Sequence, residues 1–320
     1  MSAGIAPRIW TLTDDRAGNF LQADALARAL GTLEHHVRLR FPPPWRWTSP
    51  RGVPGALARL PLPEDAARPD IAVGCGRQSA LALRALRRAG GGRVYTVQIL
   101  DPRIDPAEFD LVVAPRHDAL QGANVLCPIG AMNAIDTDWL AAARATMPAL
   151  ADGARPLNVV MIGGPHRDAA LDVEALRQLG TRLHELRARE GGSFLLCGSR
   201  RTPAHWQSVL RDIGQSLDAR CWFDARDGAS PYRAGLGHAD RIVVTADSVN
   251  MLSEACAVGV RVLSFAAGPL AGKLGEFDRT LREQGLLSSF DAAPAAQAPL
   301  RETAAIAEEI LRRWRAQPAG

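Results

Sequence analysis

A run of ten residues near the start of the chain, Thr13–Gln22, combines the residue types that transfer protons and bind anions. Its polar and small members are Asp14, Asp15, Gly18, Asn19 and Gln22. Either aspartate is a candidate general base for a hydroxyl group. Capping of the turn by one of them is an equally good interpretation. Gly18 permits a tight turn or a close approach of the backbone to a ligand. The helix predicted after it offers free N–H groups and a positive dipole end.

A second cluster follows a predicted strand that ends at Cys197. It consists of Ser199, Arg200, Arg201 and Thr202, and Pro203 comes next. Thr202 is a typical N-cap and proline is typical of the first helical position, so this pair predicts a helix start. Two guanidinium groups and a hydroxyl beside a helix N-terminus form a cradle for an anion such as phosphate. An ordinary surface turn rarely needs all of these groups together.

The third cluster, Thr245–Ala255, also joins a predicted strand to a predicted helix. Its candidate binding residues are Thr245, Asp247, Ser248, Asn250, Met251 and Glu254. The helix start supplies backbone donors for a phosphate group. Glu254 lies one and a half to two turns into that helix, where its carboxylate could accept both hydroxyls of a ribose. The alternative is a buried carboxylate that is satisfied by a neighbouring helix.

Three further signals are weaker. Gly163 and Gly164 form a turn after a strand, and Arg77 lies at a helix start where it could meet a negative group. His117 could act as a base oriented by Asp118, although adjacent side chains seldom point the same way, which favours a structural or acceptor-contact role. The motifs of NAD-binding proteins, P-loop ATPases, GxSxG hydrolases and HExxH metalloenzymes are absent, so we expect no tightly bound cofactor and no metal.

Short apolar runs alternate with helical patterns, which is typical of parallel sheets covered by helices. The predicted strands are Arg8–Thr13, Ile71–Val73, Val94–Ile99, Leu111–Ala114, Leu157–Ile162, Ser193–Cys197, Ala219–Phe223, Arg241–Thr245 and Arg261–Ser264. The predicted helices are Asn19–Leu30, Gln78–Ala89, Ala169–Glu190, Arg301–Arg315 and two that begin near Pro203 and Val249. The fold class is therefore α/β, with two Rossmann-like domains that we expect to face each other across a cleft.

A stretch rich in Pro and Gly, Met147–Pro156, predicts the domain boundary. We expect a first domain over residues 1–150, a second over 151–300, and a final helix in 301–320 that could cross back to the first. The irregular insertion Arg40–Pro54 contains Trp45 and Trp47. These two side chains could touch a lipid-linked molecule or a membrane, or the insertion could be a lid packed on the first domain.

Composition bounds the class of protein. The chain has 320 residues, of which 47% are hydrophobic and 22% charged, a globular balance. Five scattered cysteines without a CxxC pair, and a first segment without a signal peptide, predict a cytoplasmic protein. The formal net charge is +4, and the basic side chains are almost all arginine, because Lys273 is the only lysine. Peripheral binding to anionic lipid at the inner face of the membrane is compatible with this charge. Binding of nucleic acid is disfavoured as a function.

The sequence resembles a known family at these same clusters. The runs Trp10–Asp14, Gly18-Asn19, Ser199–Pro203 and Thr245–Ala255 are similar to the bacterial branch of the elongated-mitochondria (mitochondrial fission) family. Members look like GT-B glycosyltransferases, with an acceptor in the first Rossmann-like domain and a nucleotide-sugar in the second. The resemblance implies that the second and third clusters, with Gly163 and Gly164, bind this donor. It also implies that Gly18, Asn19 and Gln22 contact the acceptor or its phosphate, and Arg77, from its place at a helix start, is a further candidate for this contact.

A further resemblance concerns the run after Ser248, which is similar to the donor helix of the lipid-linked murein precursor glycosyltransferase. That likeness implies that Glu254 holds the ribose and that Ser248–Asn250 meet the diphosphate. Gly18–Gln22 departs from the Gly-His-x-x-Pro of that enzyme. We therefore expect metal-independent transfer of a sugar from a nucleotide diphosphate sugar to a cell-envelope acceptor. The alternatives are a non-catalytic GT-B scaffold that recruits a protein partner, and a nucleotide-sugar epimerase.

Overall fold

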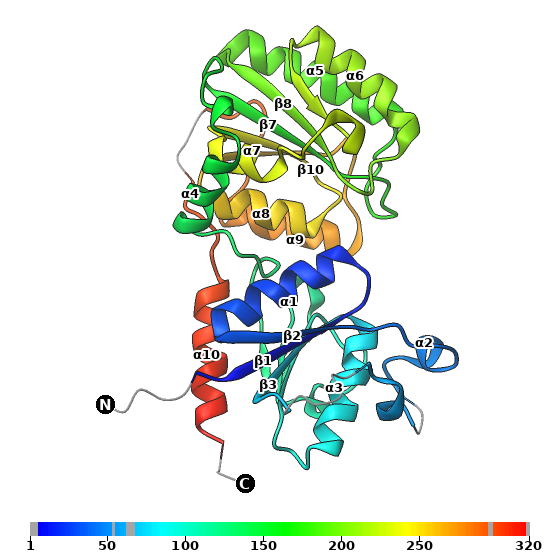
Figure 1. Ribbon diagram of the computed structural model, residues 1–320. Coiled ribbons are helices and arrows are strands. Elements are labelled where there is room, and N and C mark those ends of the chain that lie inside the picture. The colour runs from blue at the N-terminus through cyan, green and yellow to red at the C-terminus, as the bar shows by residue number, and fades with distance from the viewer. Residues whose placement is uncertain (1–5, 53–54, 62–67, 294–296, 318–320) are drawn as a thin grey trace. The chain divides into compact units, whose positions relative to one another are not determined.

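The computed structural model describes residues 6–52, 55–61, 68–293 and 297–317. Contacts between Cα atoms divide the chain into two compact units (Figure 1). The first unit combines Met1–Ala134 with Glu302–Gly320, and the second is Ile135–Arg301. The boundary expected at residues 147–156 lies inside the second unit, and the final helix is grouped with the first unit. Each unit has its own sheet and is described separately below.

The first unit is built on a parallel six-stranded sheet in the order β2-β1-β3-β4-β5-β6. Its strands are β1 (Arg8–Thr13), β2 (Thr32–Arg38), β3 (Ile71–Cys75), β4 (Tyr95–Ile99), β5 (Leu111–Val113) and β6 (Val125–Leu126). The four predicted strands are confirmed. Strand β2 was missed because it is a polar edge strand with Glu34, His35 and His36, and β6 was missed because it has only two residues.

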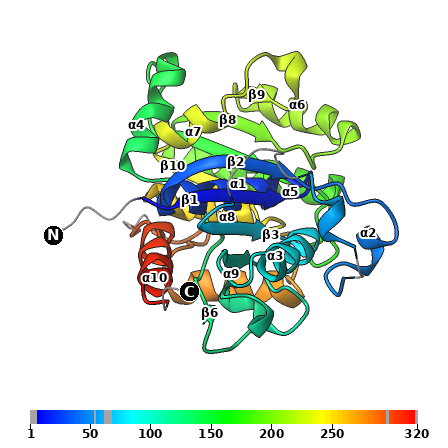
Figure 2. The same ribbon diagram turned by 60° about the horizontal axis from the view of Figure 1, so that its bottom comes forward.

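Helices cover both faces of this first sheet (Figure 2). Apolar side chains of α1 (Ala17–Leu30) and α10 (Thr303–Arg315) pack on one face, among them Leu26 and Ile310. The other face is covered by α3 (Arg77–Ala89), whose Leu83 and Leu86 join Trp10 and Leu12 in a second apolar cluster. The Rossmann-like arrangement places the starts of α1 and α3 at the carboxyl ends of β1 and β3.

The predicted insertion contains one helical turn, α2 (Trp45–Thr48). Its two tryptophans behave differently, since Trp45 packs against the apolar cluster of the α3 face whereas Trp47 is 74% exposed. Arg84 of α3 anchors the segment, because its Nη1 donates to the carbonyl oxygens of Pro50 at 2.8 Å and Arg51 at 2.9 Å. The segment Arg40–Gly52 is therefore a fixed wall beside the sheet of the first unit. Residues 53 and 54, the last two of the predicted insertion, lie outside the described residues.

The second unit is built on a parallel five-stranded sheet in the order β11-β10-β7-β8-β9. Its strands are β7 (Leu157–Ile162), β8 (Ser193–Gly198), β9 (Arg220–Trp222), β10 (Arg241–Thr245) and β11 (Arg261–Phe265). Its helices are α4 (Thr137–Thr146), α5 (Val173–Glu190), α6 (Gln207–Ser216), α7 (Tyr232–His238), α8 (Val249–Val258) and α9 (Gly272–Glu283). The prediction of two α/β units with parallel sheets is confirmed.

Two predicted helix starts in the second unit are wrong. Helix α5 begins at Val173 rather than Ala169, because Asp172 is the N-cap and its side chain accepts from the backbone N of Ala175. Thr202 is not an N-cap: a 3-10 turn begins at Ala204, and α6 follows from Gln207. Helices α7 and α9 had no clear sequence signal and were not predicted.

Candidate functional site

The second and third predicted clusters meet the Gly163-Gly164 turn at one edge of the second sheet. Strands β10, β7 and β8 are neighbours, so their carboxyl ends lie side by side. These ends lead into Asp247, the Gly163-Gly164 turn and Ser199 respectively. Open α/β sheets bind ligands at this edge. The glycine turn, which was a weak signal in the sequence, therefore becomes the centre of the arrangement.

Asp247 holds this edge together. Its buried carboxylate accepts hydrogen bonds from the backbone N of Gly164 at 3.0 Å and from the hydroxyl of Thr245 at 2.6 Å, and it forms an ion pair with Arg201. The Thr245 hydroxyl oxygen accepts from the backbone N of Gly163 at 2.8 Å. Asp247 and Thr245 therefore fix the glycine turn, and the charge of Arg201 is already compensated within the unit.

Both glycines of the turn are sterically required. A Cβ atom on Gly163 would lie 2.0 Å from the Asp247 carboxylate, and one on Gly164 would lie 2.1 Å from the carbonyl oxygen of Arg201. Neither distance is possible for a real side chain. The loop after β8 thus rests directly on the backbone of the glycine turn.

Thr202 contributes to this contact instead of starting a helix. Its hydroxyl oxygen lies 2.9 Å from the carbonyl oxygen of Ile162 and 2.6 Å from that of Gly163, and it accepts from the backbone N of Ser199 at 2.8 Å. The Ser199 hydroxyl in turn accepts from the backbone N of Arg201 at 3.2 Å. The hydroxyl groups therefore shape the loop, which corrects the predicted capping role of Thr202.

Two groups beside this framework can bind an anion, namely Arg200 and the start of α8. Arg200 is exposed, and its guanidinium group has no hydrogen bond or ion pair with the described residues. Helix α8 begins after Ser248, whose hydroxyl accepts from the backbone N of Met251 at 3.4 Å, and its first turn contains no acidic residue. The half-buried Asn250 lies in that first turn. The predicted helix start is confirmed, and its positive end is compatible with an anionic ligand.

Glu254 is half-buried on α8 and has a partner that the sequence did not suggest. The hydroxyl of Tyr232, from α7, donates to its Oε2, while Oε1 has no partner among the described residues. Burial raises the pKa of Glu254, and the bond from Tyr232 acts in the opposite direction. A neighbouring helix therefore supplies a hydrogen bond to one oxygen of the Glu254 carboxylate, as the alternative interpretation predicts. The other oxygen remains available for a hydroxyl group of a ligand.

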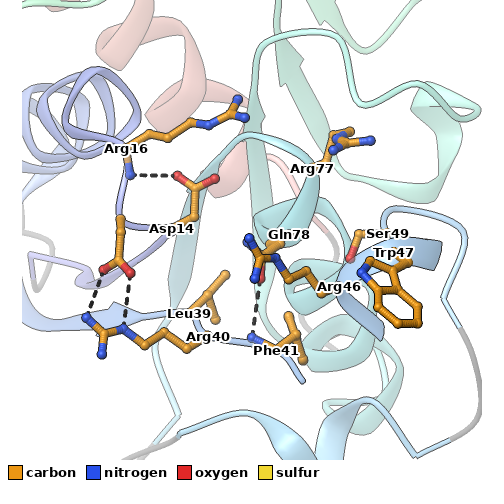
Figure 3. A pocket seen from close by; sticks show the side chains of 11 residues that line it. Asp14, Arg16, Leu39, Arg40, Phe41, Arg46, Trp47, Ser49, Arg77 and Gln78 are labelled. Atoms are coloured by element: carbon orange, nitrogen blue, oxygen red, sulfur yellow. Dashed lines mark hydrogen bonds and ion pairs between the residues drawn. The ribbon is translucent and has the colours of Figure 1, made fainter. Parts of the chain in front are cut away.

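The first unit contains a cavity of about 990 Å³ at the carboxyl ends of β1, β2 and β3 (Figure 3). It is lined by Asp14, Asp15, Arg16, Leu39, Arg40, Phe41, Arg46, Trp47, Ser49, Arg77 and Gln78. The structure thus joins the first predicted cluster to Arg77 and to the insertion. Four arginines face two aspartates, so the lining carries an excess of positive charge.

The two candidate bases of this cavity differ in their surroundings. Asp15 is bound by two arginines, with Arg40 Nε at 3.1 Å and Arg38 Nε at 3.4 Å. The Asp14 Oδ1 atom accepts from the backbone N of Arg16 at 3.1 Å and from the amide of Asn19 at 2.8 Å. Its Oδ2 atom has no partner among the described residues. Asp14 therefore caps the turn and still retains an oxygen that can accept a proton.

The remaining residues predicted in the first unit have varied positions. Gly18 lies in the first turn of α1, so its predicted tight turn is wrong, because the helix begins at Ala17. The Asn19 amide packs against Gly76, where an added Cβ would lie 2.6 Å from Nδ2. Gln22 is buried in α1 and does not line the cavity.

His117 lies in a 3-10 turn after β5, also outside the cavity lining. The carboxylate of Asp118 accepts from the backbone N of Asp101 at 3.2 Å. Asp118 thus has a structural contact of its own. A role of His117 as a base, or as a structural or acceptor contact, stays a prediction.

Two properties of the described residues bear on the class of site. Among the residues that the structure describes, no helix is both long and apolar enough to cross a membrane. Within the same residues, no group of three or more His, Cys, Asp and Glu side chains is arranged to hold a metal ion.

Comparison with solved structures identifies the fold as GT-B-like. UDP-GlcNAc 2-epimerase from Methanocaldococcus jannaschii aligns with a TM-score of 0.54 and 11% identity, covering 97% of this chain and 100% of the other. UDP-GlcNAc 2-epimerase from Neisseria meningitidis bound to UDP-GlcNAc aligns with a TM-score of 0.51 and 12% identity, covering 96% and 100%. At such low identity the likeness establishes the fold alone.

Sequence comparison establishes the family. The model of mitochondrial fission ELM1 matches residues 17–314. Mitochondrial fission protein ELM1 of Arabidopsis thaliana is 32% identical over 286 residues, covering 80% of this chain and 66%, just under two thirds, of its own length. An uncharacterized protein, RP120 of Rickettsia prowazekii (strain Madrid E), is 25% identical over 294 residues, covering 78% and 81%. The chain belongs to the mitochondrial fission ELM1 family, which confirms the resemblance.

Proposed function

We propose that this chain transfers a sugar from a nucleotide diphosphate sugar to a hydroxyl group of a cell-envelope acceptor. The observation that carries the proposal is the meeting of the Gly163-Gly164 turn, the Ser199–Thr202 loop and the start of α8 at one sheet edge. The similar GT-B fold of an epimerase bound to UDP-GlcNAc supports a nucleotide-sugar as the ligand.

In this proposal the second unit binds the nucleotide. The free Oε1 of Glu254 accepts from a ribose hydroxyl, while Tyr232 keeps the carboxylate in position. Arg200 and the start of α8 bind the diphosphate through charge-assisted hydrogen bonds. Negative charge grows on the diphosphate as it leaves, so these groups stabilise the transition state more than the bound substrate. Arg200 and the dipole of α8 then stabilise the leaving diphosphate, a role that a bound metal ion has in metal-dependent enzymes.

The first unit supplies the base. Asp14 Oδ2 takes the proton of the acceptor hydroxyl as its oxygen forms a bond to the anomeric carbon. The bond between that carbon and the diphosphate oxygen breaks, and its electron pair leaves with the nucleoside diphosphate. We assign this step to Asp14 rather than Asp15, because both oxygens of Asp15 are bound by arginines.

Calorimetric titration tests the donor site. UDP, GDP, CMP and their sugars are titrated into the protein and into the Glu254→Gln and Arg200→Gln variants, with Glu283→Gln of α9 as a surface control. We expect one nucleotide to bind and both site variants to weaken it by roughly tenfold, the value of a lost charge-assisted hydrogen bond. Absence of binding at millimolar concentration, or equal affinity of all variants, would refute the site.

A non-catalytic scaffold is the second candidate, and a specific observation favours it. The charge of Arg201 is compensated by Asp247, and Glu254 is already bonded to Tyr232, as expected where a site only maintains structure. This candidate predicts nucleotide binding without turnover. Incubation with the bound nucleotide-sugar and envelope extract, followed by NMR, distinguishes the cases: sugar transfer supports the transferase, an isomer without acceptor indicates an epimerase, and unchanged substrate supports the scaffold.

A further inference from the structure

Three guanidinium groups in the cavity of the first unit form no ion pair within the described part of the chain. Arg16, Arg46 and Arg77 line this cavity, and within the described part of the chain none of them has an ion pair or a side-chain hydrogen bond. They come from three separate segments: the N-cap of α1, helix α2 and the first residue of α3. Cations that converge on one cavity without partners repel one another, so an anionic ligand would stabilise the arrangement.

The backbone adds to this positive potential. Helices α1 and α3 have 14 and 13 residues, and both begin at the cavity. Neither has a side-chain hydrogen bond at its N-cap, and neither has an acidic residue in its first turn. The positive dipole ends therefore act in the same direction as the three arginines.

The wall that carries Arg46 is held in place before any ligand arrives. Gln78 Oε1 accepts from the backbone N of Phe41 at 3.3 Å, and Arg84 binds the carbonyl oxygens at the other end of the segment. Arg84 is itself fixed by Glu108, whose Oε2 lies 2.8 Å from its Nε. A site formed in advance loses less conformational entropy when it binds.

We infer that this cavity binds a phosphate ester through Arg16, Arg46 and Arg77. A phosphate group offers three oxygens with delocalised charge, which matches several guanidinium forks better than a single carboxylate does. The cavity of about 990 Å³ leaves room for the rest of the molecule. The exposed indole of Trp47 provides a surface for a ring or an alkyl chain. If the proposed transfer holds, the ligand is the acceptor, and its phosphate directs a hydroxyl group toward Asp14.

Binding of two defined probes tests the inference. Glucose 1-phosphate represents a soluble phosphate ester, n-decyl phosphate represents a lipid-like one, and n-decyl maltoside is the uncharged control. Each is titrated calorimetrically below its micellar concentration, at low and at high salt. We expect the phosphates to bind and the maltoside not to bind. Tighter binding of decyl phosphate, lost in Trp47→Ala, identifies a lipid-like source, and equal binding of both phosphates indicates a soluble one.

Charge-matched variants locate the site. Arg46→Gln and Arg77→Gln should each weaken phosphate binding by on the order of tenfold, and Arg77→Lys should weaken it less. Arg28→Gln removes an arginine of α1 that pairs with Asp24 away from the cavity, and it should change nothing. Equal losses in all variants would mean nonspecific attraction. No binding by the folded wild-type protein, or a loss only in Arg200→Gln, would overturn the assignment.

The two proposals fail separately. Glu254→Gln changes only the second unit, so phosphate binding should survive in it even where nucleotide binding is lost. Nucleotide binding without phosphate binding would refute this inference and leave the donor site standing. Urea unfolding of each variant shows that a loss of binding does not come from a loss of folding.

Discussion

The two candidate sites lie at the same kind of sheet edge but treat their charges differently. At the edge of the second unit, Asp247 compensates Arg201, and Tyr232 donates to Glu254, so most polar groups are satisfied by the chain itself. In the cavity of the first unit, the guanidinium groups of Arg16, Arg46 and Arg77 have no partner among the described residues. The first arrangement is a rigid framework with a few free donors, and the second is an open cationic surface.

This difference indicates what each site requires of a ligand. A buried carboxylate that accepts several hydrogen bonds fixes backbone geometry, and its removal leaves donors without acceptors. Exposed cations contribute little to folding, and their value appears only when an anion binds. Mutations in the framework of the second unit should therefore cost both stability and binding, whereas mutations of the three unpaired arginines in the cavity should cost binding alone.

The largest effect is expected at the glycine turn. Gly164→Ala would place its Cβ 2.1 Å from the carbonyl oxygen of Arg201, which forces two backbone segments apart. We expect a loss of about 3 kcal/mol in the free energy of unfolding and a loss of nucleotide binding. Urea unfolding and calorimetry measure both. Gly268→Ala is the control, since no atom lies within 4 Å of its added Cβ. Equal stability of the two variants would show that the turn is not tightly packed.

Asp247→Asn should have the next largest effect. The amide removes the ion pair with Arg201 and offers an NH₂ group where two donors, Gly164 N and the Thr245 hydroxyl, need acceptors. We expect a loss of about 2 kcal/mol in unfolding free energy, below the value of a fully buried pair because Arg201 is partly exposed. Asp291→Asn breaks the exposed pair with Arg182 and should cost under about 1 kcal/mol. A similar cost for both variants would contradict the framework role of Asp247.

Glu254→Gln should alter the pH dependence of stability. Burial raises the pKa of Glu254 above its unfolded value, so the folded chain holds this proton more tightly than the unfolded chain. The resulting stability is complete below the unfolded pKa and is lost as the pH rises through the folded pKa. Gln cannot ionise, so this loss should disappear from the variant. Unfolding free energies between pH 4 and pH 8, about the range in which a raised glutamate titrates, measure the difference.

A matched variant sharpens this prediction. Tyr232→Phe removes the hydrogen bond that lowers the pKa of Glu254, so the loss of stability with rising pH should become larger than in the wild-type protein. Parallel pH curves for wild type and Glu254→Gln would show that Glu254 is solvated rather than buried.

The strands were the most predictable part of the molecule. Arg8–Thr13, Leu157–Ile162 and Arg241–Thr245 were predicted with the bounds that the structure has, because central parallel strands are buried on both faces and contain short apolar runs. The start of α8 was predicted from Ser248 and the positions after it. Strand β2 could not be found in this way, since an edge strand alternates polar and half-buried residues. The local residue pattern thus predicted the central strands and the start of α8, but it did not predict an edge strand whose formation depends on pairing with its neighbour.

The sites were predictable only as separate pieces. Glycine, arginine and aspartate after strand ends indicated the loops, but sheet order decides that β10, β7 and β8 bring three of these loops together. The pairing of Tyr232 with Glu254 joins two helices and has no local pattern, although Tyr232 is one of only two tyrosines. Trp47 was named as a possible contact with a lipid-linked molecule, but Arg46 was missed as a lining residue because the path of the insertion depends on anchors such as Arg84.

The smallest effect is expected from Asp15→Asn, and it tests the contrast between the two sites directly. Asp15 is exposed and pairs with Arg38 and Arg40, so its loss should change the unfolding free energy by under about 1 kcal/mol. The same change frees the guanidinium group of Arg40, which lines the cavity, and that of Arg38, so binding of glucose 1-phosphate should become tighter. Asp24→Asn releases Arg28 on the same unit with the same change in net charge, and should leave binding unaltered. Weaker phosphate binding in Asp15→Asn would mean that Asp15 positions Arg40 for the ligand, and the cavity would then be a framework like that of the second unit.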